Sequence, residues 1–341
     1  MRIGILTGGG DAPGLNGIIE SATKTLINKN VEVIGICDGF EGVFNNNTIN
    51  LNFKNVDGIH CHAGTLLGTS SKCGTQGREE EFLIAYKKLN LDGLIAAGGD
   101  GTFRGLMPFK DEINILGVPK TIDNDLNGTD RTFGFDTACS VVSESIDSLK
   151  STAYAHKRVI VLETMGRTAG WIALGGGIAG FSDAILIPEL PFDSSKLLAF
   201  INNRMKEQRG MIITVSEGAH AKNEKIHVAF KALNSPQVDR LGGIAEHLSK
   251  IIFKETGHES RHVVLGHLQR AKAPTTIDRF FTLEMGTKVA ELCLSRSWNM
   301  GISMINGKVV PVPIGDFMGE AKLVPKEHNW VNIAQKLGIF I

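Results

Sequence analysis

The sequence predicts an α/β protein with largely parallel sheets, and three observations support this prediction. Short apolar runs rich in Ile, Val and Leu recur without polar alternation, as expected for strands buried on both faces of a parallel sheet. Helical periodicity separates several of these runs, which is typical of α/β folds. Many of the 40 glycines stand at the ends of the runs rather than in linkers.

The predicted elements follow from these runs in chain order. Strands are expected at 2–7, 31–36, 93–97, 113–118, 158–164, 184–188, 211–216 and 262–266. Helices are expected at 15–28, 136–156, 196–208, 244–256 and 283–298. The chain divides near Phe135, so two domains are predicted: 1–134 with about 269–318, and 135–268 with the C-terminal segment. The residues from Gly301 onward show no clear pattern.

Composition limits the possible partners and locations. The 341 residues include 36 basic and 36 acidic side chains, so no overall field attracts nucleic acid or an anionic membrane. No apolar run has the length of a membrane span and the N-terminus lacks a leader pattern, which predicts a cytoplasmic protein. The five cysteines are widely spaced without a CxxC pair, which argues against a disulfide framework or a zinc site built on them.

Residues 8–14 (GGGDAPG) follow the first predicted strand and open a helix. Ligands of open α/β sheets bind outside the carboxyl ends of strands, so such ends are where chemistry is expected. Free backbone N–H groups and the helix dipole at this position can hold a phosphate. The alternative is a tight glycine turn without a ligand.

Residues 98–102 (GGDGT) place Asp100 inside a second glycine loop after a strand. A carboxylate there repels phosphate unless a cation intervenes, and Mg²⁺ bound by Asp100 solves this problem. The alternative role for Asp100 is a helix N-cap.

Residues 119–125 (PKTIDND) place two carboxylates beside a lysine. Phosphoryl transfer to an alcohol needs a proton acceptor, which we assign to Asp123, and a supporting or metal-linked acid, which we assign to Asp125. Lys120 supplies a cation that steadies charge on the moving group. The alternative is a solvated turn.

These motifs, together with 163–167 (ETMGR) and 261–270 (RHVVLGHLQR), resemble those of the 6-phosphofructokinase family in order and spacing, from Ile3 to about Arg279. The resemblance implies two doubly wound, Rossmann-like domains with an active-site cleft between them. The first would bind the nucleotide and Mg²⁺, the second the sugar phosphate. The implied reaction moves a phosphoryl group from ATP to the 1-hydroxyl of fructose 6-phosphate, giving fructose 1,6-bisphosphate in glycolysis.

The resemblance also implies roles for individual residues. The matching catalytic residues are Lys120, Thr121, Asp123, Asp125 and Arg167. The matching cofactor-binding residues are Gly10, Asp100, Gly101, Thr102 and Gly105, with Asp100 on the metal. The matching substrate-binding residues are Thr121, Asp123, Arg158, Met165, Gly166, Arg167, Glu217, Arg261, His267 and Arg270. Arg158 and Arg261 match arginines that reach the sugar 6-phosphate across a subunit interface, so a homodimer or homotetramer with shared sites is expected.

Two residues point to different phosphoryl donors. Gly101 leaves room for the α-phosphate of ATP, where an aspartate would crowd and repel it. Lys120 is usual in pyrophosphate-dependent members. Steric and charge exclusion outweighs an additional cation, so ATP is expected and pyrophosphate is the alternative.

The pattern breaks at three places. The arginine expected after the turn at 64–68 is absent, and Lys72 is its candidate substitute without bidentate geometry. Ala271 and Lys272 replace two glycines after Arg270. Glu20 replaces an effector-binding arginine, which argues against control by ADP or phosphoenolpyruvate there. These departures support the alternative of a regulatory sugar-phosphate-binding subunit. A kinase for another ketose phosphate is a further alternative.

Overall fold

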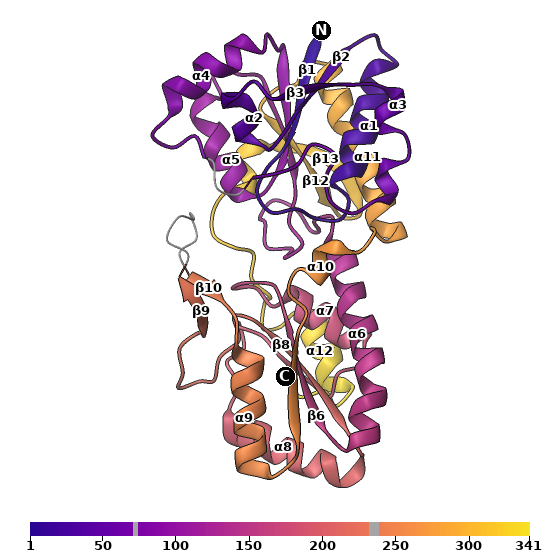
Figure 1. The fold of residues 1–341 in the computed structure, drawn as a ribbon, viewed down its shortest axis with the longest axis vertical. Coiled ribbons are helices and arrows are strands. Elements are labelled where there is room, and N and C mark those ends of the chain that lie inside the picture. Colours follow the sequence, from indigo (N-terminus) through magenta and orange to yellow (C-terminus); the bar gives the residue numbers. More distant parts are fainter. Residues whose placement is uncertain (71–73, 232–238) are drawn as a thin grey trace. The chain divides into compact units, whose positions relative to one another are not determined.

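The computed structural model describes residues 1–70, 74–231 and 239–341. The chain forms two compact units, each with its own largely parallel sheet (Figure 1). Unit 1 comprises Met1–Ile122, Leu126–Thr137 and Arg270–Glu320. Unit 2 comprises Asp123–Asp125, Ala138–Gln269 and Ala321–Ile341. The ligands expected for each domain stay predictions.

Among the described residues, unit 1 holds a seven-stranded sheet in the order β13-β12-β5-β4-β1-β2-β3. The strands are β1 (Arg2–Thr7), β2 (Glu32–Ile36), β3 (Thr48–Leu51), β4 (Gly93–Gly98), β5 (Ile115–Pro119), β12 (Met300–Ile305) and β13 (Lys308–Pro313). The central pairs run parallel, whereas β3 and β13 pair antiparallel at the two edges. The predicted α/β class with largely parallel sheets is confirmed.

The helices of unit 1 cover its sheet. They are α1 (Leu15–Ile27), α2 (Phe40–Phe44), α3 (Phe53–Val56), α4 (Glu79–Lys88), α5 (Asp100–Leu106) and α11 (Thr276–Leu294), with 3₁₀ turns η1 (Ile59–Cys61), η2 (Met107–Phe109) and η3 (Ile314–Phe317). α1 and α11 lie side by side, and the Ser21 hydroxyl of α1 donates to the carbonyl of Thr282. A Cβ at Gly286 would lie 1.9 Å from that hydroxyl oxygen, so glycine permits this close approach.

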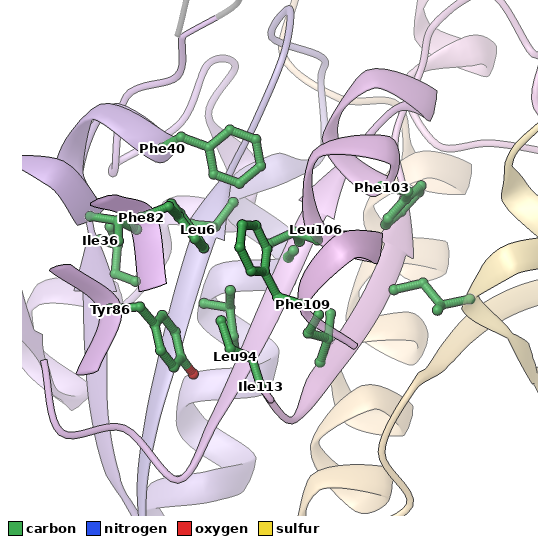
Figure 2. Close-up of a cluster of buried hydrophobic side chains, with 14 of the residues drawn as sticks. Leu6, Ile36, Phe40, Phe82, Tyr86, Leu94, Phe103, Leu106, Phe109 and Ile113 are labelled. Carbon is green, nitrogen blue, oxygen red and sulfur yellow. The ribbon is translucent and has the colours of Figure 1, made fainter. Parts of the chain in front are cut away.

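An aromatic cluster fills the core on one side of this sheet (Figure 2). Phe82 of α4 is fully buried, and its ring centroid lies 4.7 Å from that of Phe109 and 5.6 Å from that of Phe40. The Phe40–Phe82 pair is edge-to-face, the arrangement that the ring quadrupole favours. This cluster anchors α2 and α4 to the sheet and so supports the loops at its carboxyl edge.

In the described part of unit 2, a four-stranded parallel sheet has the order β11-β6-β8-β7. Its strands are β6 (Val159–Thr164), β7 (Ala184–Leu186), β8 (Met211–Ser216) and β11 (Ser260–Val264). The remaining helices are α6 (Phe135–His156), α7 (Trp171–Ala179), α8 (Ser194–Glu207), α9 (Ile244–Thr256), α10 (Leu268–Ala271) and α12 (Asn329–Lys336). A short antiparallel pair, β9 (Val228–Lys231) and β10 (Asp239–Leu241), precedes α9.

Two parts of the sequence-based prediction need correction. The residues from Gly301 onward do carry structure, because they contribute β12 and the edge strand β13 to the sheet of unit 1. The last long helix begins at Thr276 rather than at 283, because the Thr275 hydroxyl accepts from the Asp278 N–H and caps the helix there. Within the described ranges, no helix has both the length and the apolar character needed to cross a membrane.

Candidate active site

Three neighbouring strands of unit 1 end in the glycine loops and the lysine that the sequence singled out. β1 leads into Gly8, β4 ends at Gly98, and β5 ends next to Lys120. The order β5-β4-β1 places these ends side by side at one edge of the sheet. The Gly8 N–H donates to the Ala97 carbonyl, and the Lys120 N–H donates to the Gly98 carbonyl.

Thr102 locks the two glycine loops together. A Cβ at Gly8 would lie 2.6 Å from the Thr102 hydroxyl oxygen, and a Cβ at Gly98 would lie 2.4 Å from the same atom. Thr102 is only 5% exposed, so its side chain serves packing between the loops. Any larger residue at these glycines has to displace Thr102 or the backbone.

Two cations surround Gly10 in unit 1. The buried Lys120 ammonium donates to the Gly10 carbonyl. A Cβ at Gly10 would lie 2.6 Å from Nη1 of Arg270, and this atom lies 3.9 Å from Oδ1 of Asp11. The structure places the Arg270 guanidinium beside the first glycine loop of unit 1, and its expected contact with the sugar phosphate stays a prediction. The pair of cations makes this loop suitable for an anionic ligand.

Asp100 lies in the first turn of α5, and Gly99 occupies the N-cap position. The alternative that Asp100 caps the helix is therefore wrong. Both carboxylate oxygens accept from Nε of Arg104 at 2.8 Å, and the side chain is 39% exposed. The carboxylate oxygens of Asp100 are ligands of the kind that Mg²⁺ prefers. A cation bound to them would replace the exposed ion pair with Arg104.

The other glycines of this loop differ in their surroundings. A Cβ at Gly101 would meet no atom within 4 Å, so the position is open. A Cβ at Gly105 would lie 3.0 Å from the Phe40 ring, and the Gly105 carbonyl accepts from the Thr75 hydroxyl. Gly105 thus serves helix packing. Lys72 lies outside the described residues.

The segment 119–125 links the two units. The Thr121 carbonyl accepts from the Thr132 hydroxyl within unit 1. Asp123 is 7% exposed and groups with unit 2. The Lys322 N–H donates to the Asp125 carbonyl at 2.7 Å, and the Trp171 indole donates to the Lys322 carbonyl at 2.8 Å. The C-terminal segment therefore connects the backbone of Asp125 to Trp171, which follows the MGR motif.

In unit 2, the ends of β11, β6 and β8 carry the residues expected to bind the sugar phosphate. The Arg167 N–H donates to Oε1 of Glu217 at 2.9 Å, which joins the ends of β6 and β8. The Met165 N–H donates to Oε1 of Gln269 at 3.3 Å, which joins β6 to the segment after β11 that carries His267. The three strand ends form one polar group within unit 2.

The backbone and electrostatics of this group are unusual. Gly166 has φ 139°, a conformation that side chains disfavour, and Arg167 has φ 53°. Burial raises the pKa of Glu217 above its ordinary value, an effect larger than the opposing hydrogen bond from the Arg167 N–H. A half-buried carboxylate with a raised pKa at a strand end is typical of a ligand site.

Arg158 and Arg261 lie at the opposite end of this sheet. Arg158 precedes β6, and Arg261 pairs in register with Ile160 near the start of that strand. Both guanidinium groups contact Oε1 of Glu259, at 2.8 Å and 2.5 Å. These two arginines therefore face away from the Met165 and Glu217 group of their own unit.

Three positioning residues of unit 2 were not predicted from the sequence. Gln269 joins two strand ends, and its Nε2 also donates to the Gly266 carbonyl. Glu163 accepts from the N–H groups of Gly243 and Ala245 at the start of α9. Lys322 holds the segment of Asp125. Each acts through contacts distant in sequence, and Gln269 and Glu163 could have been suspected only because they lie within the recognised motifs.

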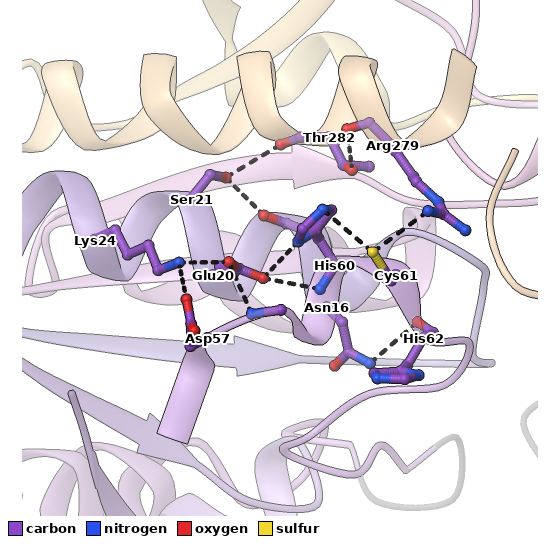
Figure 3. A network of polar contacts seen from close by, with 12 residues as sticks. Asn16, Glu20, Ser21, Lys24, Asp57, His60, Cys61, His62, Arg279 and Thr282 are labelled. Atoms are coloured by element: carbon purple, nitrogen blue, oxygen red, sulfur yellow. Dashed lines mark hydrogen bonds and ion pairs between the residues drawn. The ribbon is translucent and has the colours of Figure 1, made fainter. Parts of the chain in front are cut away.

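Glu20 of α1 is satisfied by its own chain (Figure 3). Its carboxylate accepts from the Lys24 ammonium at 2.7 Å, from Nδ1 of His60 at 2.8 Å, and from the N–H groups of His60 and Gly58. Burial raises the pKa of Glu20, but these hydrogen bonds together outweigh it and lower the pKa to about 2. A buried carboxylate at this position opposes the binding of an anionic effector.

Replacing Glu20 with glutamine is expected to destabilise the protein by about 1–3 kcal/mol at neutral pH, because several half-buried donors lose a buried, charged acceptor. Since the pKa is about 2 in the folded protein against an ordinary 4.5, the stabilisation is present above the ordinary value and is lost as the pH falls towards 2. Urea midpoints at neutral and acidic pH measure this, with exposed Glu112→Gln as the control. A deficit that does not shrink in acid contradicts the assignment.

The sequence is similar to known phosphofructokinases over almost its whole length. The profile of the family described as "Phosphofructokinase" matches residues 2–293. An "ATP-dependent 6-phosphofructokinase 2" of Clostridium perfringens is 40% identical, over 99% of this chain and 97% of that protein. Another "ATP-dependent 6-phosphofructokinase 2", of Streptomyces coelicolor, is 38% identical over 96% of this chain and 98% of that protein.

Solved structures agree on the fold. Phosphofructokinase from Saccharomyces cerevisiae superposes with a TM-score of 0.81 at 27% identity, over 93% of this chain. This chain spans only 44% of that longer yeast chain. A pyrophosphate-dependent phosphofructokinase from Marinobacter aquaeolei superposes with a TM-score of 0.84 over all of this chain and 88% of that chain, and its 20% identity supports the fold alone. The chain belongs to the phosphofructokinase family.

Proposed function

We propose that this protein is an ATP-dependent 6-phosphofructokinase that phosphorylates the 1-hydroxyl of fructose 6-phosphate in glycolysis. The observation that carries the proposal is the polar group at the ends of β6, β8 and β11, where the Arg167 N–H bonds Glu217 and Gln269 bonds Met165. Full-length relatives at 40% and 38% identity bear the same activity in their names.

In this proposal the chemistry begins at Asp123. Its carboxylate takes the proton of the 1-hydroxyl while the hydroxyl oxygen attacks the γ-phosphorus of ATP, and ADP leaves with the electron pair of the broken P–O bond. The low exposure of Asp123, 7%, limits competing water. Arg167 and His267 bind the sugar phosphate, and Asp125 supports the loop that carries Asp123.

Mg²⁺ is the metal that the donor loop suits. Asp100 is the proposed ligand, because its carboxylate is 39% exposed and stands in a glycine loop whose amides can face phosphate oxygens. Bound there, the ion would supply positive charge that neutralises the phosphates of the donor. Arg104 would then release the Asp100 carboxylate that it now holds.

Two features support ATP rather than pyrophosphate as the donor. Gly101 is open, with no atom within 4 Å of a Cβ placed there, so a larger donor has room beside it. The Lys120 ammonium is engaged by the Gly10 carbonyl, so it stabilises the glycine loop. This contact accounts for the lysine at position 120 in an enzyme that does not use pyrophosphate.

We further propose that the active enzyme is a homodimer or homotetramer with shared sites. Arg158 and Arg261 lie at the end of their sheet opposite to Glu217. From there they can bind the sugar phosphate in the site of a partner subunit. Mixing inactive Arg158→Ala chains with inactive Asp123→Ser chains is expected to restore part of the activity, because a mixed oligomer holds some sites with both residues intact. Mixtures that stay as inactive as the separate variants contradict shared sites.

The sugar specificity is tested by product formation with Mg²⁺ and ATP. Fructose 6-phosphate is expected to be the preferred acceptor among ketose phosphates, with product phosphorylated at both ends of the sugar. If another ketose phosphate is phosphorylated more efficiently, that sugar is the acceptor instead of fructose 6-phosphate. Sugar-phosphate binding without turnover by any donor would identify a regulatory subunit instead.

A further inference from the structure

A second cluster of metal-ligating side chains lies in unit 2 and consists of residues with no role assigned above. It consists of Glu224, His227 and His247, and one candidate ligand atom from each lies within 4.8 Å of the others. Among the described residues, this is the group of three or more histidine, cysteine and acidic side chains with such spacing. Two imidazoles and one carboxylate form a donor set typical of Zn²⁺ and related cations.

The backbone brings these three side chains together from separate segments. Glu224 ends a turn in which its N–H donates to the Ala221 carbonyl, and Ala221 is bridged to Phe192. His227 immediately precedes β9, and its carbonyl accepts from the Gly242 N–H after β10. His247 lies in the first turn of α9.

Two glycines make this return of the chain possible. Gly242 has φ 138° and Gly243 has φ 85°, conformations that a side chain disfavours. They turn the chain from β10 into α9, whose buried Leu248 is anchored in the core beside His247. The three side chains thus start from anchored backbone.

The side chains converge without hydrogen-bonding one another. Nε2 of His227 and Nε2 of His247 lie 3.9 Å and 3.7 Å from Oε2 of Glu224, beyond hydrogen-bond length. The two imidazole centroids are 4.5 Å apart with the rings tilted by 42°. Nε2 of His247 is buried and, within the described part of the chain, has no hydrogen-bond partner. Burial removes the hydrogen bond that water would make to this nitrogen, and a bound ion would supply the missing interaction.

We propose that Glu224, His227 and His247 bind a divalent transition-metal ion, with Zn²⁺ as the best match. Ligands on tetrahedral Zn²⁺, with bonds of about 2.0–2.1 Å, lie about 3.3 Å apart, so side-chain rotations of modest size close the site. The side chains are 39%, 29% and 38% exposed, which gives the ion an entry path and leaves a fourth position to water. Mg²⁺ does not suit imidazole ligands and is not expected to compete.

A bound ion would join three segments that are separate in the sequence. It would tie the turn of Glu224 and the base of the β9–β10 pair to the first turn of α9. Because the ion binds this folded arrangement, it is expected to raise the thermal unfolding midpoint. The site is therefore a structural clamp rather than part of the phosphoryl-transfer chemistry.

The test uses the full-length chain, freed of metal by chelation, and titrates it with Co²⁺ and Zn²⁺ in the absence of Mg²⁺ and nucleotide. The expected result is one ion per chain, with the intense visible absorption of four-coordinate Co²⁺ and displacement of Co²⁺ by Zn²⁺. Glu224→Gln, His227→Gln and His247→Gln should each weaken binding by at least about tenfold. The matched control is His156→Gln, an exposed histidine of unit 2 outside the cluster.

Two outcomes overturn the proposal. Wild-type chain that binds neither ion at micromolar concentrations excludes the site. Binding that is equally strong in wild type and His247→Gln, with unaltered cobalt absorption, places the ion elsewhere, for example on thiols. Metal-free melting curves of the variants establish that each is folded, and the choice of glutamine preserves side-chain size and polarity.

Discussion

Replacing Asp123 with serine is expected to lower kcat by about 10²–10⁴ while the affinity for fructose 6-phosphate changes little. The reason is that the carboxylate is required as a proton acceptor in the transition state, whereas sugar binding depends on the strand ends of unit 2. Asp123 is 7% exposed, and serine is smaller and polar, so the substitution introduces no steric clash. Steady-state kinetics and calorimetric titration with the sugar phosphate separate the two quantities.

The matched control for this experiment is Asp111→Ser, which removes an exposed carboxylate of unit 1. It should retain normal turnover. An Asp123→Ser enzyme within tenfold of wild type would remove Asp123 from the mechanism. A variant that also loses sugar binding would indicate a structural role instead.

Replacing Gly101 with aspartate is expected to lower kcat/KM for ATP by about 100-fold and to impair pyrophosphate use less. A second negative charge about 5 Å from a phosphate, at an effective dielectric constant of about 20, costs roughly 3 kcal/mol. A Cβ at this position meets no atom within 4 Å, and the backbone is not in the left-handed region, so the fold should tolerate the side chain. The loss should therefore appear in donor use.

Gly101→Ala is the control for this second prediction, because it adds a side chain without charge. It should keep most of the ATP-dependent activity and the wild-type melting temperature. If Gly101→Asp lowers kcat/KM equally for ATP and for pyrophosphate, residue 101 does not select the phosphoryl donor. Comparing kcat/KM for both donors in all three proteins decides the matter.

The parallel strands of the two sheets were predictable because their apolar runs are continuous. β1, β4, β6 and β8 are buried along nearly their whole length, so their sequences show no alternation. β13 escaped prediction because it is a partly exposed edge strand that contains two prolines, which weaken the strand signal. β12 is buried only in its middle, and its pairing partners lie far away in the sequence.

The site residues divide in a similar way. Glycine loops and the MGR motif are local patterns, so the sequence alone predicted that Gly10, Gly101 and Arg167 follow the ends of strands, where the structure has them. Lys322 was not predictable, since its hydrogen bond to Trp171 spans 151 residues. The position of Arg270 beside Gly10 was not predicted either. A motif gives a residue's neighbours in the sequence but not the direction in which its side chain points.

The central claim is that this chain phosphorylates fructose 6-phosphate with ATP. The direct measurement is the ratio of kcat/KM for ATP to that for pyrophosphate, at saturating fructose 6-phosphate and Mg²⁺, with one preparation of the protein. We expect turnover with ATP and a ratio far above one. Turnover with pyrophosphate but not with ATP would contradict the claim.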